Sequence, residues 1–370
     1  MLIQIHILQN YAPSNLNRDD TGSPKDAFFG GLKRGRVSSQ CIKRSIRHSE
    51  IFKEAFQARN LLASRTKRLP GMIDEELKAM EVDEEIRAAI VARIPEIGRE
   101  SGKGGGTKTE EGEIETKQLI FISPNERRPL AEKLLATYQE KGAKNWPKVK
   151  IGDLTKALGA SVPRSVDVSM FGRMTTSAAF EDVQAAVQVA HSLTTSAVET
   201  EFDYFTAVDD ISGESGAGMI GDVEFNSATH YKYFNIHWEE LVKNLGDDKG
   251  IAKEAVLALI EAAATAQPSG KQNSFAAHNL PDLILIEVSK RNLPVSYANA
   301  FLKPVRQTYD KSLMDVSVAA LDDYAKRLHK VYGVNGLHAY VAVGEHDITG
   351  ADGQESLVDL EAWLAAQLPA

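Results

Sequence analysis

Hydrophobic and polar positions alternate at the start of the chain, where Gln4 and His6 separate Ile3, Ile5 and Ile7. A period of two predicts a strand over residues 2–8, and a period of three to four predicts a helix. The same patterns recur along the chain. The further strands expected are residues 166–171, 224–238, 283–288 and 338–343, and the helices expected are residues 38–56, 74–93, 124–141, 181–191, 249–266, 310–332 and 355–367.

Two segments interrupt these patterns. Residues 102–117 (GKGGGTKTEEGEIETK) contain almost no apolar side chains, which predicts a loop inside a charge-rich helical insertion. Residues 203–222 are rich in glycine and lie between strand-like segments, which predicts a long β-arm. Because strands and helices follow one another without a regular βαβ order, the sequence favours the α+β class.

Composition restricts the kind of protein. A chain of 370 residues favours two to three structural units, and its charge of 43 − 51 = −8 gives no general reason to bind nucleic acid. No run of eighteen apolar residues is present, and the first residues lack the basic and apolar regions of a signal peptide. The single cysteine, Cys41, can form neither an internal disulfide nor a thiolate zinc site. We therefore expect a soluble cytoplasmic protein without a membrane segment.

A local basic cluster stands out in this acidic chain. Six Lys and Arg residues and no acid lie between Leu32 and Ser49. On the helix expected from Ser38, the side chains of Gln40, Lys43, Arg44 and Arg47 share one face, while Ile42 and Ile46 lie on another. The amides at a helix N-terminus favour an anion, and arginine binds phosphate bidentately. A phosphate-binding face and a merely solvated face are nearly equal interpretations of this pattern.

Outside the basic cluster, the sequence patterns for metal binding or catalysis are weak. The pairs Asp19-Asp20 and Asp209-Asp210 contain the oxygen ligands of a divalent cation, although acids in Gly/Ser loops more often form turns. They support an alternative function, a metal-dependent ribonuclease. His6, His48 and His191 lack catalytic or metal-ligand spacing, and SGKGGGT lacks the order of a phosphate loop. We expect no catalytic residue, metal or cofactor.

Several strings together resemble one family. They are NLNRDDTGSPKDAFFGG (15–31), RVSSQCIKRSIR (36–47), FGRMTTS (171–177), FDYFTAVDD (202–210), GDVEFNSATHYKY (221–233) and SYANAF (296–301). In this order they resemble the CasC, or Cse-type, backbone subunit of the type I-E CRISPR surveillance complex, Cascade. The resemblance implies a palm like an RNA-recognition motif (ferredoxin-like), a helical fingers insertion and a β-hairpin thumb. The implied division is palm 1–57, 162–201 and 225–370, fingers 58–161, and thumb 202–224.

The resemblance also implies a function and a set of contact residues. Copies would stack head to tail along a CRISPR guide RNA and present it to a target DNA strand, without catalysis. Further partners would be a large subunit, small subunits, a 5′-end cap subunit and a guide-processing endonuclease. The implied RNA contacts are Arg18, Lys25, Ser38, Gln40, Lys43, Arg44, Arg47, Arg173, Met174, Met219, Ile220, Lys271 and Gln272. Among them, Arg173, Met174 and the arm-tip residues Met219 and Ile220 would meet a base turned out of the guide.

Overall fold

A computed structural model describes residues 1–96, 112–150, 165–173, 182–207, 211 and 219–369, together with the backbone of residues 107–108. The chain divides into two compact units. The first contains residues 1–52, 188–238 and 256–370, and the second contains residues 53–187 and 239–255. The predicted α+β class is confirmed, because the first unit is built on a large, mostly antiparallel sheet and the second is mainly helical.

The sheet of the first unit has the strand order β14-β13-β12-β1-β11-β9-β3-β2, with β8 and β10 also paired to β11. Its strands are β1 (Leu2–Ser14), β2 (Asp26–Phe29), β3 (Leu32–Val37), β8 (Val187–Val189), β9 (Ser192–Thr194), β10 (Glu201–Ala207), β11 (Met219–His237), β12 (Leu283–Ser289), β13 (Leu337–Ala342) and β14 (Asp352–Gly353). Its helices are α1 (Ser39–Arg47), α2 (Glu50–Phe52), α10 (Gln272–Phe275), η4 (Ala298–Phe301), α11 (Leu313–Tyr332) and α12 (Leu357–Gln367).

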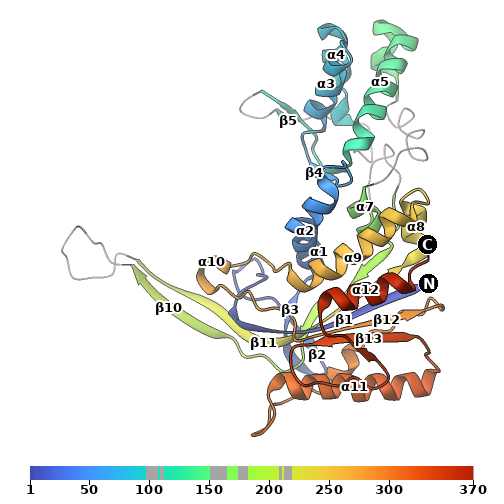
Figure 1. The fold of residues 1–370 in the computed structure, drawn as a ribbon. Helices are drawn as coiled ribbons and strands as arrows, with labels where there is room; N and C mark the ends of the chain where they lie inside the picture. Colours follow the sequence, from blue (N-terminus) through green and yellow to red (C-terminus); the bar gives the residue numbers. More distant parts are fainter. Residues whose placement is uncertain are drawn as a thin grey trace. The chain divides into compact units, whose positions relative to one another are not determined.

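The central strand β1 is buried on both faces. Ile3, Ile5 and Ile7 are fully buried on one face, and Gln4 and His6 are equally inaccessible on the other. Figure 1 shows α11 along one side of the sheet and α1 and α12 on the opposite side. The polar face of β1 therefore lies in the interior, where its side chains need hydrogen-bond partners.

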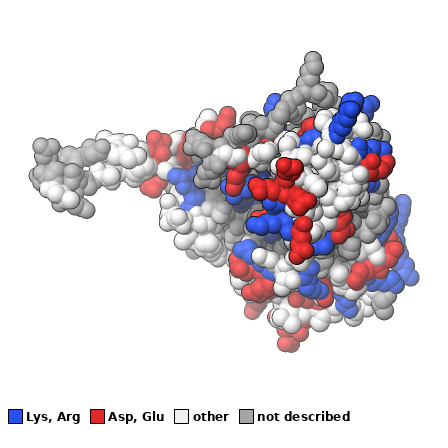
Figure 2. All heavy atoms as spheres, turned by 90° about the horizontal axis from the view of Figure 1, so that it is seen from above, with Lys and Arg blue, Asp and Glu red and all other residues white. Residues whose placement is uncertain are grey.

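The predicted β-arm is present as a hairpin of β10 and β11, paired from Glu201↔Phe225 to Ala207↔Met219. It extends well beyond the rest of the sheet (Figure 1). Every residue of β10 is exposed, and Phe202 and Tyr204 are each 64% exposed. Figure 2 shows acidic side chains near the base of the hairpin and uncharged side chains toward its end. Large apolar side chains are thus held in solvent by a strand pair that has no core of its own.

The second unit has its own apolar core, formed by side chains such as Ile73, Ile90, Leu130 and Trp146. Its elements are a π-helical turn (Lys53–Gln57), β4 (Ser64–Thr66), α3 (Leu69–Ala79), α4 (Glu84–Val91), the 3₁₀ helix η2 (Ile94–Glu96), β5 (Thr107–Lys108), β6 (Ile114–Glu115), β7 (Ile120–Ile122), α5 (Pro124–Asn145), the 3₁₀ helix η3 (Trp146–Lys148), α7 (Val166–Phe171) and α8 (Trp238–Asn244). Helix α9 (Lys249–Thr265) begins in the second unit and ends in the first. None of the described helices has both the length and the apolar run needed to cross a lipid bilayer.

Three local predictions were wrong. Residues 166–171 form helix α7 rather than a strand, and the part of residues 181–191 that is described contains strand β8 rather than a helix. The helix expected over residues 38–56 is divided into α1, α2 and a π-helical turn. In each case a short apolar pattern fits more than one secondary structure, and packing decides which forms.

Candidate nucleic-acid interface

The loop that follows β1 is fixed to the sheet and to α1 by two asparagines. Asn15 Nδ2 donates to the backbone oxygens of Gly22 and Glu224, each at 2.9 Å. Asn17 Oδ1 accepts a hydrogen bond of 2.9 Å from the Ser38 amide, directly before the helix. These bonds hold the loop containing Arg18 beside the N-terminus of α1.

Helix α1 begins as its sequence predicts. The Ser38 hydroxyl accepts from the Cys41 amide at 3.3 Å, and no acid lies in the first turn. Ile42 and Ile46 are buried, whereas Gln40 and Arg44 are exposed and Lys43 and Arg47 are half-buried. Burial lowers the pKa of Lys43. The helix therefore presents a polar, basic face beside an N-terminus at which the backbone favours an anion.

Arg18 and Arg44 line one open groove of about 560 Å³, together with Cys41, Ser45 and Gly270. A smaller hollow of about 220 Å³ brings Arg18 together with Lys271 at the base of the hairpin, beside Asp222 and Glu224. Glycine is required at position 270, since a Cβ atom there would lie 2.3 Å from the Leu16 carbonyl oxygen. Three cations from separate parts of the sequence thus meet around one loop.

Asp19 and Asp20 line the same groove. One oxygen of Asp19 accepts hydrogen bonds from the Thr21 hydroxyl, the Thr21 amide and the Ser23 amide. These bonds, above all the one from the Thr21 hydroxyl, lower the pKa of Asp19. The carboxylate thus shapes the turn that carries Arg18, as expected for an aspartate in a Gly/Ser loop. Asp209 and Asp210, the other predicted pair, lie outside the described residues.

The remaining predicted contacts of this region have partly structural roles. Lys25 is half-buried, and its amide donates to the Asn17 carbonyl at 2.8 Å. Lys271 adopts a left-handed conformation (φ 52°) before α10. Gln272 Nε2 donates to the carbonyls of Pro268 (3.0 Å) and Ala277 (3.3 Å) and so closes the turn behind Lys271. Lys271 borders the hollow, whereas the amide nitrogen of Gln272 stabilises the turn.

Three members of the basic cluster between Leu32 and Ser49, all on β3, make contacts within the protein. Lys33 forms an ion pair of 2.6 Å with Asp26, which raises the pKa of Lys33. Arg36 donates to the Asp26 carbonyl and contacts His191. Arg34 is fully buried, and its guanidinium donates to four backbone carbonyls: Thr194 (2.9 Å), Thr195 (2.9 Å), Phe301 (2.7 Å) and, at 3.5 Å, Leu302. Strand β3 therefore contributes a buried structural arginine, which its sequence did not reveal.

Among the described residues, the predicted contacts of the turned-out base include one buried and two exposed side chains. Arg173 is buried in the second unit, where it pairs with Glu126 at 2.8 Å and donates to the Phe121 carbonyl. Met174 lies outside the described residues. Met219 and Ile220 begin β11 on the hairpin and are 59% and 62% exposed. The side chains of Met219 and Ile220 are thus exposed to solvent, whereas the guanidinium of Arg173 forms an internal ion pair.

Comparison with known proteins shows the family to which this chain belongs. The profile of the CT1975-like protein family matches residues 3–366, so the chain belongs to this family. A chain of a solved "CRISPR RNA-guided surveillance complex, pre-nicking" is similar to it, with 30% identity, a TM-score of 0.82 and full coverage of both chains. A chain of a second "CRISPR RNA-guided surveillance complex" has 26% identity and a TM-score of 0.73 over 99% of this chain and 100% of that one. Comparison with curated proteins gives no match.

Proposed function

We propose that this protein is a non-catalytic backbone subunit of a type I-E CRISPR Cascade complex that binds guide RNA in the cytoplasm. The observation that carries this proposal is the groove in which Arg18 and Arg44 meet beside the N-terminus of α1. Phosphate groups bind at such sites through arginine and free backbone amides. The family and the two similar chains support guide RNA as the source of those phosphates.

The hairpin supplies the second part of the proposal. An isolated pair of strands that exposes Phe202, Tyr204 and Ile220 gains stability when a partner covers these side chains. In our proposal, each hairpin reaches the next copy along the guide, and its end contacts a base turned out there. Contacts of this head-to-tail kind leave an open surface at each end, so copies add along the RNA. The division into palm, fingers and thumb given above belongs to this proposal, as do the other Cascade subunits and the target DNA strand as partners.

Native mass spectrometry of the full chain with single-stranded RNAs of increasing length tests the proposal. We expect the number of bound copies to rise in regular steps with RNA length and to be independent of base sequence. A single copy on every RNA would contradict stacking, and no binding to any RNA would contradict the function itself.

Incubation of RNA with protein and Mg²⁺ or Mn²⁺, with and without a chelator, separates this function from a ribonuclease. We expect the RNA to remain intact. Cleavage that needs the metal and disappears in Asp20→Ala would instead support the enzyme, with Asp19, Asp20, Asp209 and Asp210 as candidate ligands.

A further inference from the structure

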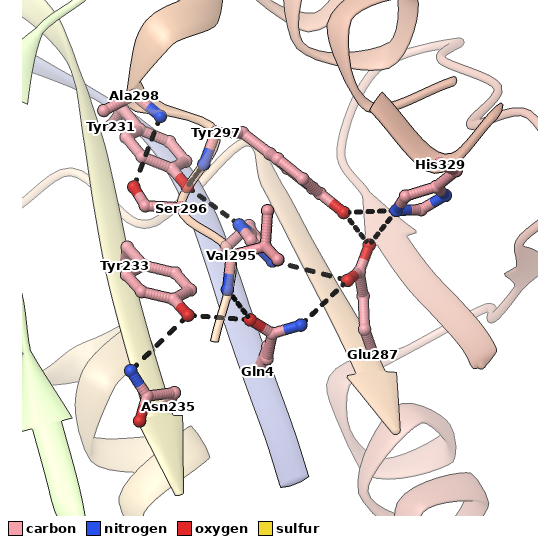
Figure 3. Close-up of polar contacts among 11 residues, drawn as sticks. Gln4, Tyr231, Tyr233, Asn235, Glu287, Val295, Ser296, Tyr297, Ala298 and His329 are labelled. Atoms are coloured by element: carbon pink, nitrogen blue, oxygen red, sulfur yellow. Dashed lines mark hydrogen bonds and ion pairs between the residues drawn. The ribbon is translucent and has the colours of Figure 1, made fainter. Parts of the chain in front are cut away.

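A buried carboxylate lies among histidines on the face of the sheet beneath α11. Strand register places Gln4 of β1, Glu287 of β12 and His338 of β13 in one row, since Gln4 pairs with Glu287 and Glu287 with His338. Helix α11 brings His329 to the same point, with its Nε2 atom 3.7 Å from Glu287 Oε1. Figure 3 shows Glu287 between Gln4, Tyr297 and His329. Side chains from β1, β13 and α11 thus meet at the carboxylate on β12.

The donor atoms have the spacing of a metal site. One ligand atom each from Glu287, His329 and His338 lie within 4.8 Å of one another. Tetrahedral zinc, with bonds near 2.0–2.1 Å, needs ligand atoms about 3.4 Å apart, so the pair at 3.7 Å must approach by only a few tenths of an ångström. The Tyr297 hydroxyl lies 2.6 Å from both Glu287 Oε1 and His329 Nε2, so its hydrogen bonds hold these two ligand atoms close together.

The surroundings orient these ligands and add a further nitrogen. Gln4 Nε2 donates to Glu287 Oε2 at 3.3 Å and fixes the plane of the carboxylate. His6 is completely buried, and its Nε2 atom has no hydrogen-bond partner among the described residues although it lies 3.8 Å from Glu287 Oε2. An unpaired buried polar atom costs free energy, so a positive charge near Glu287 would favour this arrangement less than a partner for His6 itself, and His6 is left outside the proposed ligand set. His329 is 21% exposed, so the cluster has a path to solvent.

We propose that Glu287, His329 and His338 bind a divalent transition-metal cation, best matched by zinc, that ties α11 to β12 and β13. Imidazole nitrogens with a carboxylate oxygen suit zinc, cobalt and nickel, whereas magnesium and calcium prefer oxygen ligands alone. The site lies on the opposite side of the sheet from α1 (Figure 1), so its role is structural and independent of RNA binding.

Cobalt(II) titration of the full chain, after tag removal and treatment with a chelator, tests this site. We expect one equivalent of cobalt to bind with the visible absorption bands of a tetrahedral complex, and zinc to displace it. His338→Gln should weaken cobalt binding at least about tenfold, since even the loss of a group that orients a ligand costs this much. The matched control is His278→Gln, which changes an exposed histidine outside the cluster and should leave the titration unchanged.

Circular dichroism establishes whether both variants fold. Zinc should raise the melting temperature of the wild type and of His278→Gln but not that of His338→Gln. Absence of the cobalt bands in the wild type would overturn the proposal, and this result does not depend on any variant. An identical titration of His338→Gln and the wild type would also overturn it.

Discussion

Replacing both Arg18 and Arg44 by alanine removes the two arginines that line the groove beside α1. Each phosphate contact to a single strand contributes about 0.7 to the slope of log affinity against log salt. Loss of two contacts should therefore reduce that slope by about 1.4. Between 50 and 200 mM salt, a fourfold change, the wild type should lose about sevenfold more affinity than the double variant.

Fluorescence anisotropy with labelled single-stranded RNA at several salt concentrations measures both slopes. The matched control is Arg128→Ala with Arg327→Ala, which removes the same charge from exposed helical ion pairs with Glu132 and Asp323. We expect the control to keep the wild-type slope, because long-range effects of net charge are largely screened at these salt concentrations. Equal slopes for the wild type and the Arg18/Arg44 variant would refute the assignment of the groove to phosphate.

Three further outcomes are expected. Arg34→Met should lower the free energy of unfolding by about 3–5 kcal/mol, because three buried carbonyls lose a charged donor. Urea denaturation measures this change, and a loss as small as that of Arg327→Met would contradict the prediction. Burial, and then repulsion from Glu261, raises the pKa of Glu361 to about 7. The folded protein therefore favours the protonated carboxyl group, and the stability that this group contributes is lost as pH rises through that value. Melting temperatures of Glu361→Gln and the wild type should therefore diverge from pH 5 to pH 8, with the variant more stable at pH 8, and parallel curves would contradict the shift. Deletion of residues 212–219 should leave the monomer folded by circular dichroism and abolish stepwise binding to long RNA in native mass spectrometry, whereas intact multi-copy complexes would exclude the hairpin from assembly.

The local features of α1 were predictable from its sequence because they depend only on residues close together in the chain. Ser38 caps the helix, and Ile42 and Ile46 face the core. The meeting of Arg18 with Arg44 was not predictable, since it rests on hydrogen bonds that Asn15 and Asn17 make across the fold. Long-range contacts of this kind leave no periodic signal in the chain.

Burial explains why the strand predicted over residues 166–171 was wrong. Alternation along residues 166–171 suggested a strand with one apolar face, yet residues 166–170 are all buried, so the alternation did not mark a solvent side. Strand β1 shows the same limit of alternation, because its polar residues Gln4 and His6 are buried as fully as its isoleucines. Likewise, Glu287, His329 and His338 have no motif spacing, and only strand register and the docking of α11 bring them together.

The groove and the hairpin differ in chemistry, which separates two properties of the proposed RNA complex. The groove carries Arg18 and Arg44, and its contribution to affinity weakens as salt rises. The described part of the hairpin carries no Lys or Arg, so in the proposed complex the contacts of its exposed Phe202, Tyr204 and Ile220 would depend little on salt. If the hairpin sets the spacing of copies on the guide, that spacing should persist at salt concentrations that weaken overall affinity. The hairpin then determines where each copy binds, and the groove determines how tightly.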